Sequence, residues 1–259
     1  MSVAEAYVAR LADTGITHGL IGPHEAPRLW DRHVLNSAVT APVFDRDARV
    51  ADIGSGAGLP GIPLAIARPD LHLTLVEPLL RRTVWLTAAV DELGLTNVEV
   101  HRGRAESLWG VTRFRHVTAR AVARTGELAR LCLPLLEAGG SLHALKGGQV
   151  DDELEADAEQ LRALGGSRWS VSRFGTGIVD PETVVVSLEV DAAVPVPSSA
   201  PRRRAARSRT WPCSRGPGGS TSQTSLRRHA CGSARPTLRC RSLRPARWHS
   251  ASAAAHAKS

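Results

Sequence analysis

An acidic side chain and three regularly spaced glycines follow the first strongly apolar run of the chain. Asp52 precedes Gly54, Gly56 and Gly58, so every second residue of this turn lacks a side chain. Glycine lets the backbone turn tightly and leaves no Cβ between the main chain and a ligand. Pro60 suits the first turn of a following helix, whose N-terminus would aim free N–H groups and a positive dipole at the loop. We therefore predict a nucleotide-like cofactor site at the carboxyl end of a first β-strand.

The spacing of the glycines discriminates between cofactors. The dinucleotide pattern Gly-x-Gly-x-x-Gly would need a glycine at position 59, where Leu59 stands. An acid followed by alternating glycines fits a ligand without a pyrophosphate, such as S-adenosylmethionine, whose ammonium group can face the carboxylate of Asp52. A second acid for the ribose hydroxyls is expected roughly 20 residues on, and Glu77 ends the next apolar run. A structural turn without a ligand, or a nicotinamide or flavin site, are the alternatives.

The charge of the chain is divided between a body and a tail. The 259 residues carry a formal net charge of +8, but residues 201–259 hold 14 of the 33 Lys and Arg residues and no Asp or Glu. Residues 1–200 hold 19 basic and 25 acidic residues, a net charge of −6. The chain does not open with the basic start and apolar run of a signal peptide, and no apolar run reaches the ~20 residues of a membrane span. We expect a cytoplasmic enzyme with no membrane partner.

The cysteines do not suggest a metal site. Cys132 lies in an apolar helical run, where a small buried hydrophobe is expected. Cys213, Cys231 and Cys240 lack Cys-x-x-Cys spacing, so no zinc site is predicted.

Strand and helix patterns alternate through the body. Strands are predicted at 49–53, 72–77, 97–101, 115–119, 140–145, 168–174 and 183–190. Helices are predicted at 4–13, 24–41, 60–68, 79–93, 124–137 and 151–164. Gly94 closes the helix at 79–93, and Gly139-Gly140 are expected to stop the helix at 124–137. This alternation predicts a parallel sheet with helices on both faces, and the last two strands should pair antiparallel at one edge.

These elements predict three regions. Residues 1–45 form an N-terminal helical cap, 46–191 the catalytic domain, and 192–259 a linker with a disordered Arg-rich tail. The tail is either an arm that binds RNA phosphates or an extension without a specific role, such as the product of a shifted reading frame.

Five short segments occur together in the order of a known family. They are Arg32-His33-Val34-Leu35-Asn36-Ser37, Asp52 to Leu64, Arg104-Ala105-Glu106, Ala119-Arg120-Ala121-Val122-Ala123 and Ala144-Leu145-Lys146-Gly147. Through them, residues 3–190 resemble the glucose-inhibited division protein B family, the RsmG-type 16S rRNA methyltransferases. The resemblance implies a class I methyltransferase fold, which is Rossmann-like with a mostly parallel seven-stranded sheet. It also implies S-adenosylmethionine as methyl donor and, as acceptor, N7 of a guanosine in 16S rRNA of the small ribosomal subunit.

The resemblance assigns roles to individual residues as well. Cofactor contacts are implied for Gly54, Leu59, Glu77, Ala105, Glu106 and Arg120, and they join Asp52, Gly56 and Gly58, which are predicted from the loop itself. Glu77 would bind the ribose, and the Ala105 backbone and Glu106 carboxylate would bracket the adenine. Arg120 would lie beside the cofactor or the target base. A solvated acid at Glu106 and a surface ion pair at Arg120 are the alternatives.

This chain departs from the family pattern at two places. Asn36 stands where the family usually has aspartate, so charge pairing with Arg32 should be weaker. Near the last strand, where many relatives have an arginine, the chain reads Asp180-Pro181-Glu182-Thr183-Val184.

The implied chemistry needs no general base, because guanine N7 carries a free lone pair and no proton. The enzyme must align nucleophile, methyl carbon and sulfur in a water-poor site and splay the base from its neighbours. We predict catalytic roles for His33 and for Arg120. His33 would touch the target or order the N-terminal helix, and a core histidine is the alternative.

The RNA contacts are predicted from charge. Candidate phosphate ligands are Arg32, Arg81, Arg82 and Lys146, which with Arg120 and Arg124 could form a basic rim on an acidic body. Aromatic residues are scarce, so we expect the protein to recognise a structured RNA–protein surface rather than a free single strand. No binding to DNA is expected. A monomer is expected.

Two other functions remain open. A small-molecule methyltransferase would turn over without RNA. A basic-tailed nucleic-acid-binding protein with a vestigial pocket would lose its activity with residues 201–259.

Overall fold

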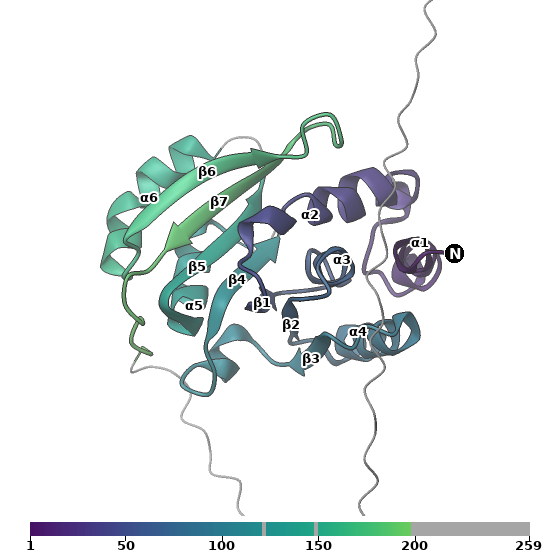
Figure 1. The fold of residues 1–259 in the computed structure, drawn as a ribbon, viewed down its shortest axis with the longest axis horizontal. Coiled ribbons are helices and arrows are strands. Elements are labelled where there is room, and N and C mark those ends of the chain that lie inside the picture. Colours follow the sequence, from purple (N-terminus) through teal and green to yellow (C-terminus); the bar gives the residue numbers. More distant parts are fainter. Residues whose placement is uncertain (121–122, 148–149, 198–259) are drawn as a thin grey trace, which may run out of the picture. The chain divides into compact units, whose positions relative to one another are not determined.

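A computed structural model describes residues 1–120, 123–147 and 150–197, and seven strands of this part form one sheet (Figure 1). The strand order is β3-β2-β1-β4-β5-β7-β6. The strands are β1 (Arg49–Ile53), β2 (His72–Glu77), β3 (Val98–Arg102), β4 (Phe114–Arg120), β5 (Leu136–Lys146), β6 (Arg168–Phe174) and β7 (Thr183–Glu189). The first five are parallel, whereas β7 pairs antiparallel with both β5 and β6. The predicted fold class is confirmed. The tail predicted to be disordered lies outside the described residues from position 198 on.

Helices cover both faces of this sheet, with α3 (Gly61–Ala67) and α4 (Leu80–Leu93) on one side and α5 (Thr125–Cys132) and α6 (Asp151–Ala163) on the other (Figure 1). Side chains of β1 alternate between the two layers: Val50 belongs to the buried cluster that contains Leu64 of α3, and Ala51 to the cluster that contains Leu128 of α5. Burial on both faces explains why the predicted strand is apolar almost throughout. Within the described ranges, no helix is long and apolar enough to cross a membrane.

The N-terminal segment predicted as a cap, residues 1–45, consists of short helical pieces and is called the cap below. They are α1 (Val3–Arg10), the π-helical η1 (Leu11–Gly15), the 3₁₀-helical η2 (Pro23–Arg28), the π-helical η3 (Leu29–Leu35), α2 (Asn36–Ala38) and the 3₁₀-helical η4 (Ala41–Val43). The continuous helix predicted at 24–41 is therefore wrong. Pro27 lies inside η2 and has no N–H to donate, and Arg28, with φ −113° and ψ 8°, leaves the helical conformation before η3 begins.

The boundary between α5 and β5 also differs from the prediction. The helix stops at Cys132 and is followed by the 3₁₀ turn η6 (Leu133–Leu135), which contains Pro134. Gly139 and Gly140 therefore do not stop a helix: they lie inside β5, where the pairing with β4 shifts register. Gly139 has φ +71°, and a Cβ on Gly140 would lie 2.9 Å from the carbonyl oxygen of Arg115. The two glycines form an irregularity within the strand rather than a cap. Gly94, with φ +65°, does end α4 as predicted.

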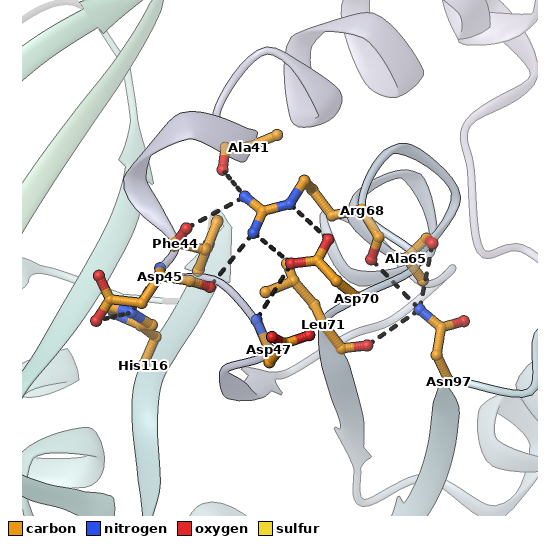
Figure 2. Close-up of polar contacts among 10 residues, drawn as sticks. All are labelled: Ala41, Phe44, Asp45, Asp47, Ala65, Arg68, Asp70, Leu71, Asn97 and His116. Atoms are coloured by element: carbon orange, nitrogen blue, oxygen red, sulfur yellow. Dashed lines mark hydrogen bonds and ion pairs between the residues drawn. The ribbon is translucent and has the colours of Figure 1, made fainter. Parts of the chain in front are cut away.

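One arginine ties the end of the cap to the start of the sheet (Figure 2). The guanidinium of Arg68 donates to the carbonyl oxygens of Ala41, Phe44 and Asp45 and to both carboxylate oxygens of Asp70. Arg68 also holds the pKa of Asp70 well below its ordinary value. This network fixes the chain as it enters β1, at the end of the sheet away from the glycine loop.

Candidate functional site

The glycine loop follows β1 and turns through three left-handed residues. Gly54, Gly56 and Gly58 have φ values of +74°, +57° and +92°, which explains why these positions are glycine. The loop N–H groups are used inside the protein: Gly58 and Leu59 both donate to the carbonyl oxygen of Ser55. The expectation of free N–H groups at the following helix is wrong, because the Gly61 N–H donates to Asp52 Oδ2 at 3.1 Å. Such a loop suits a ligand other than a phosphate.

Gly58 and Gly61 are constrained by packing. A Cβ on Gly58 would lie 2.5 Å from Ile62 Cδ1, and a Cβ on Gly61 would lie 2.3 Å from Leu75. A Cβ on Gly56 would meet only the Gly54 carbonyl, at 3.8 Å. Of these three glycines, Gly56 is therefore the one whose bare Cα leaves room for a ligand.

Asp52 is fully buried at the carboxyl end of β1. Its Oδ2 is bonded to Gly61, whereas Oδ1 has no hydrogen-bond partner among the described residues. Burial raises the pKa of Asp52 to about 7, and the Gly61 N–H and the charge of Arg120 oppose this rise. A buried carboxylate oxygen without a donor is costly. The amino group of S-adenosylmethionine is the kind of donor that would satisfy Oδ1, so the residues present fit this cofactor.

Three strand ends meet beside the loop. Glu77 ends β2, and its buried carboxylate accepts the Gly56 N–H at 3.1 Å and the Leu79 N–H at 3.0 Å. The Gly103 N–H, just after β3, donates to the Glu77 carbonyl. Ala105 and Glu106 follow immediately, in the 3₁₀ turn η5 (Ala105–Leu108), with Ala105 buried. The fold thus gathers these predicted cofactor residues around the carboxyl edge of β1, β2 and β3.

Tyr7 closes the loop from the cap, and sequence reasoning missed it. Its hydroxyl donates to the carbonyl oxygen of Ala57 at 2.8 Å, and the side chain is fully buried. Burial, followed by the nearby charge of Asp52, raises the pKa of Tyr7 well above its ordinary value. The only signal in the sequence is that Tyr7 is the single tyrosine of the chain.

Arg120, at the end of β4, turns toward the cap rather than toward solvent. One guanidinium nitrogen lies 2.8 Å from His33 Nδ1 and 3.1 Å from the Arg32 carbonyl oxygen. The other donates to the His33 carbonyl at 3.4 Å and to Ser37 Oγ at 3.3 Å. His33 Nε2 in turn lies 2.8 Å from Glu25 Oε2. Two predicted catalytic residues are therefore in contact, and Glu25 and Ser37, not singled out from the sequence, complete the group.

A cavity of about 700 Å³ lies beside Arg120. Its walls come from the cap, from the ends of β4 and β5, and from the β6–β7 hairpin. Basic residues dominate its charge: Arg28, Arg32, Arg120, Lys146 and Arg173, against Asp31, Asp180 and Glu182. Sequence reasoning missed Arg28 and Arg173, because nothing in their local patterns places them together.

The four predicted phosphate contacts are not equivalent. Arg32 and Lys146 line the cavity, but Lys146 Nζ also lies 2.8 Å from Glu153 Oε1 and is mostly buried. Arg81 is exposed on α4, whereas Arg82 lies 3.8 Å from Glu77. Arg32 Nε lies 3.4 Å from Glu25 Oε2, but half of its side chain remains exposed. Arg32 and Arg81 are therefore the more available of the four. In the described part of the chain, no three His, Cys, Asp or Glu side chains are grouped to hold a metal ion.

A sheet of order 3-2-1-4-5-7-6 with an antiparallel seventh strand, and acids at the ends of β1 and β2 around a glycine loop, defines an S-adenosylmethionine-dependent methyltransferase of class I. Residues 1–182 match the GidB family, described as rRNA small subunit methyltransferase G. The chain belongs to this family.

Its relatives carry the same description. A protein of Arthrobacter sp. (strain FB24) is 51% identical over 191 residues, covering 74% of this chain and 88% of its own. One of Thermobifida fusca (strain YX) is 50% identical over 208 residues, covering 78% and 88%. Both are named ribosomal RNA small subunit methyltransferase G. A solved structure of an O-methyltransferase family protein from Burkholderia thailandensis is 14% identical, with a TM-score of 0.49 over 71% of this chain and 62% of that chain.

Proposed function

We propose that this chain transfers the methyl group of S-adenosylmethionine to N7 of a guanosine in 16S rRNA of the small ribosomal subunit. The observation that carries the proposal is the basic cavity beside Arg120. This residue lines the cavity, and its charge also acts on Asp52 at the carboxyl end of β1, just before the glycine loop. A site for a polyanionic acceptor thus adjoins a site for a cationic methyl donor. The family descriptions support rRNA as the acceptor.

On the cofactor side, each residue receives a role from its position. Asp52 Oδ1 would face the amino group, Glu77 the ribose hydroxyls, and Ala105 and Glu106 the adenine. Gly54, Gly56 and Leu59 would contact the cofactor from the loop. Gly58 mainly allows the loop to pack against Ile62. When bound, S-adenosylmethionine supplies an electrophilic methyl group on a sulfonium. Asp52 is fully buried, so the amino group that it would hold is shielded from water.

On the acceptor side, no side chain has to remove a proton, since guanine N7 has none. His33 fits this requirement, because both of its ring nitrogens are already engaged, by Arg120 and by Glu25. We propose that His33 and Arg120 position the cap rather than exchange protons with the base. Arg28, Arg32 and Arg173 would neutralise phosphates at the mouth of the cavity, with Arg81 as a further contact.

The wider organisation belongs to the same proposal. Residues 1–45 would act as the cap, 46–191 as the methyltransferase domain and 192–259 as a linker and tail without a part in catalysis. The partner would be the small ribosomal subunit, and the protein would work as a monomer in the cytoplasm.

The test uses methyl-labelled S-adenosylmethionine with the full chain and either 30S subunits or naked 16S rRNA lacking the modification. Chemical cleavage at N7-methylguanosine then locates the label. One labelled site confined to one rRNA loop, abolished by Asp52→Ala, is the expected result. Label on small molecules without RNA, or none despite measurable cofactor binding, would refute the proposed acceptor.

A further inference from the structure

Arg120, His33 and Glu25 form a continuous polar relay between the sheet and the cap. Arg120 comes from β4, His33 from η3 and Glu25 from η2, and the two contacts along the relay are both 2.8 Å. The His33 side chain is 11% exposed, so water does not readily replace either partner. Arg120 and His33 are thus in direct contact although they lie 87 positions apart in the sequence.

The chemistry of the partners selects one state of the imidazole. A guanidinium has only donors, so the nitrogen that faces Arg120, Nδ1, must offer its lone pair. Nε2 must then carry the proton, which it donates to the Glu25 carboxylate. Only the neutral Nε2–H tautomer satisfies both contacts. A proton on Nδ1 would remove the acceptor of Arg120 and place two cations against each other.

The relay holds one wall of the cavity. Arg120 also donates to the carbonyls of Arg32 and His33 and to Ser37 Oγ, so it grips η3 and the start of α2. Arg32 and Asn36 of this same stretch line the cavity. On the far side, Thr183 of β7 donates its hydroxyl to the Asn36 carbonyl at 2.9 Å. The position of this wall therefore depends on the contacts that Arg120 makes.

We propose that Arg120, His33 and Glu25 are a proton-linked latch, in which neutral His33 locks η3 and α2 into the wall of the cavity and protonation of His33 loosens that wall. This inference rests on the proposed function, since the cavity is taken as the RNA site. His33 is then a positioning residue for the RNA substrate, and the protein binds that substrate best when His33 is neutral.

The surrounding charges decide the direction of the effect. Among the residues that the structure describes, three charged groups face His33: Arg120 from β4, Arg32 from η3 and Glu25 from η2. Burial lowers the pKa of His33, Arg120 and Arg32 lower it further, and Glu25 raises it. The neutral form thus prevails at neutral pH, and the latch opens on the acid side of the ordinary histidine range.

The first experiment needs no substrate. The ring ¹⁵N shifts of histidine in the full chain are followed by NMR against pH, with His33→Asn identifying the His33 signals. The neutral Nε2–H tautomer is expected. Glu25→Gln should move the His33 titration to lower pH and Arg120→Met should move it to higher pH. An Nδ1–H tautomer, or a His33 titration unmoved by Glu25→Gln, would overturn the relay.

The second experiment measures methyl transfer to 30S subunits or 16S rRNA against pH, at saturating S-adenosylmethionine so that the titration of Asp52 is suppressed. Below the pKa of His33 the KM for RNA should rise about tenfold, the worth of one charge-assisted contact, with kcat less affected. His33→Asn keeps an acceptor near the position of Nδ1 but cannot titrate, so the rise in KM at low pH, the acid limb of the profile, should disappear. In Glu25→Gln the acid limb should shift to lower pH. His72→Asn, at an exposed histidine at the start of β2, is the matched control and should keep the wild-type profile.

The two experiments separate the inference from the function beneath it. If the NMR titrations behave as expected and no RNA is methylated at any pH, the proposed function fails while the relay stands. If RNA is methylated and His33→Asn retains the acid limb in KM, the latch is refuted and the function stands.

Discussion

Tyr7→Phe removes a single oxygen atom from the contact between the cap and the glycine loop. The ring remains, so no cavity is created, but the buried Ala57 carbonyl loses its donor. Leaving a buried acceptor unsatisfied costs about 1–3 kcal/mol. For a domain of this size, each 1 kcal/mol lowers Tm by about 2–4 °C, so a decrease of about 2–12 °C is expected. Urea unfolding followed by far-UV circular dichroism measures the free energy of unfolding.

The same substitution should weaken cofactor binding, because Ala57 belongs to the loop that would carry S-adenosylmethionine. Calorimetric titration of the full chain should show a Kd for S-adenosylmethionine raised several-fold. Thr14→Val is the matched control: it removes the hydroxyl through which the cap accepts from Trp85 Nε1 of α4 at 2.9 Å, but leaves the loop contact intact. It should lower stability without changing the Kd. Wild-type stability and wild-type affinity in Tyr7→Phe would refute the assigned role of Tyr7.

Three further outcomes follow from other parts of the molecule. Because the pKa of Asp52 is raised to about 7, its protonation stabilises the ligand-free fold below about pH 4, and this contribution is lost as pH rises through 7. Asp52→Asn should flatten that pH slope of the urea midpoint and weaken S-adenosylmethionine binding; an unchanged slope would contradict the assignment. Arg68→Met removes five hydrogen bonds and should lower the free energy of unfolding by about 2–4 kcal/mol. Its Kd for S-adenosylmethionine, measured by calorimetry, should be unchanged because the network lies at the other end of the sheet. Deletion of residues 198–259 should leave methyl transfer to rRNA nearly intact while reducing salt-sensitive binding to unrelated nucleic acid, since it removes 14 basic residues. Loss of transfer on deletion would make the tail a part of the RNA site.

Local patterns were sufficient for much of the fold. Alternating strand and helix periods predicted all seven strands to within a few residues, because each strand buries its own apolar side chains and its ends are marked by turn residues. Gly94 was recognised as a helix end because only a left-handed residue fits there. The predicted helix boundaries were wrong near Pro27 and at Gly139-Gly140. Proline and glycine can end a helix, but they can also lie inside a 3₁₀ turn or an irregular strand. Local sequence does not distinguish these uses.

The sequence by itself determined the cofactor class. An acid, alternating glycines and a second acid lie within one strand–turn–helix–strand unit, and its short connections fix their relative positions. Only the tertiary structure decided what Arg120, His33 and Tyr7 contact, because those partners come from distant segments. It also showed that Lys146 is engaged by Glu153, and that the basic cavity takes residues from the cap, the sheet and the last hairpin. The sequence gives the charge of each side chain, but whether that side chain is available to a ligand depends on the neighbours that it contacts in the folded protein.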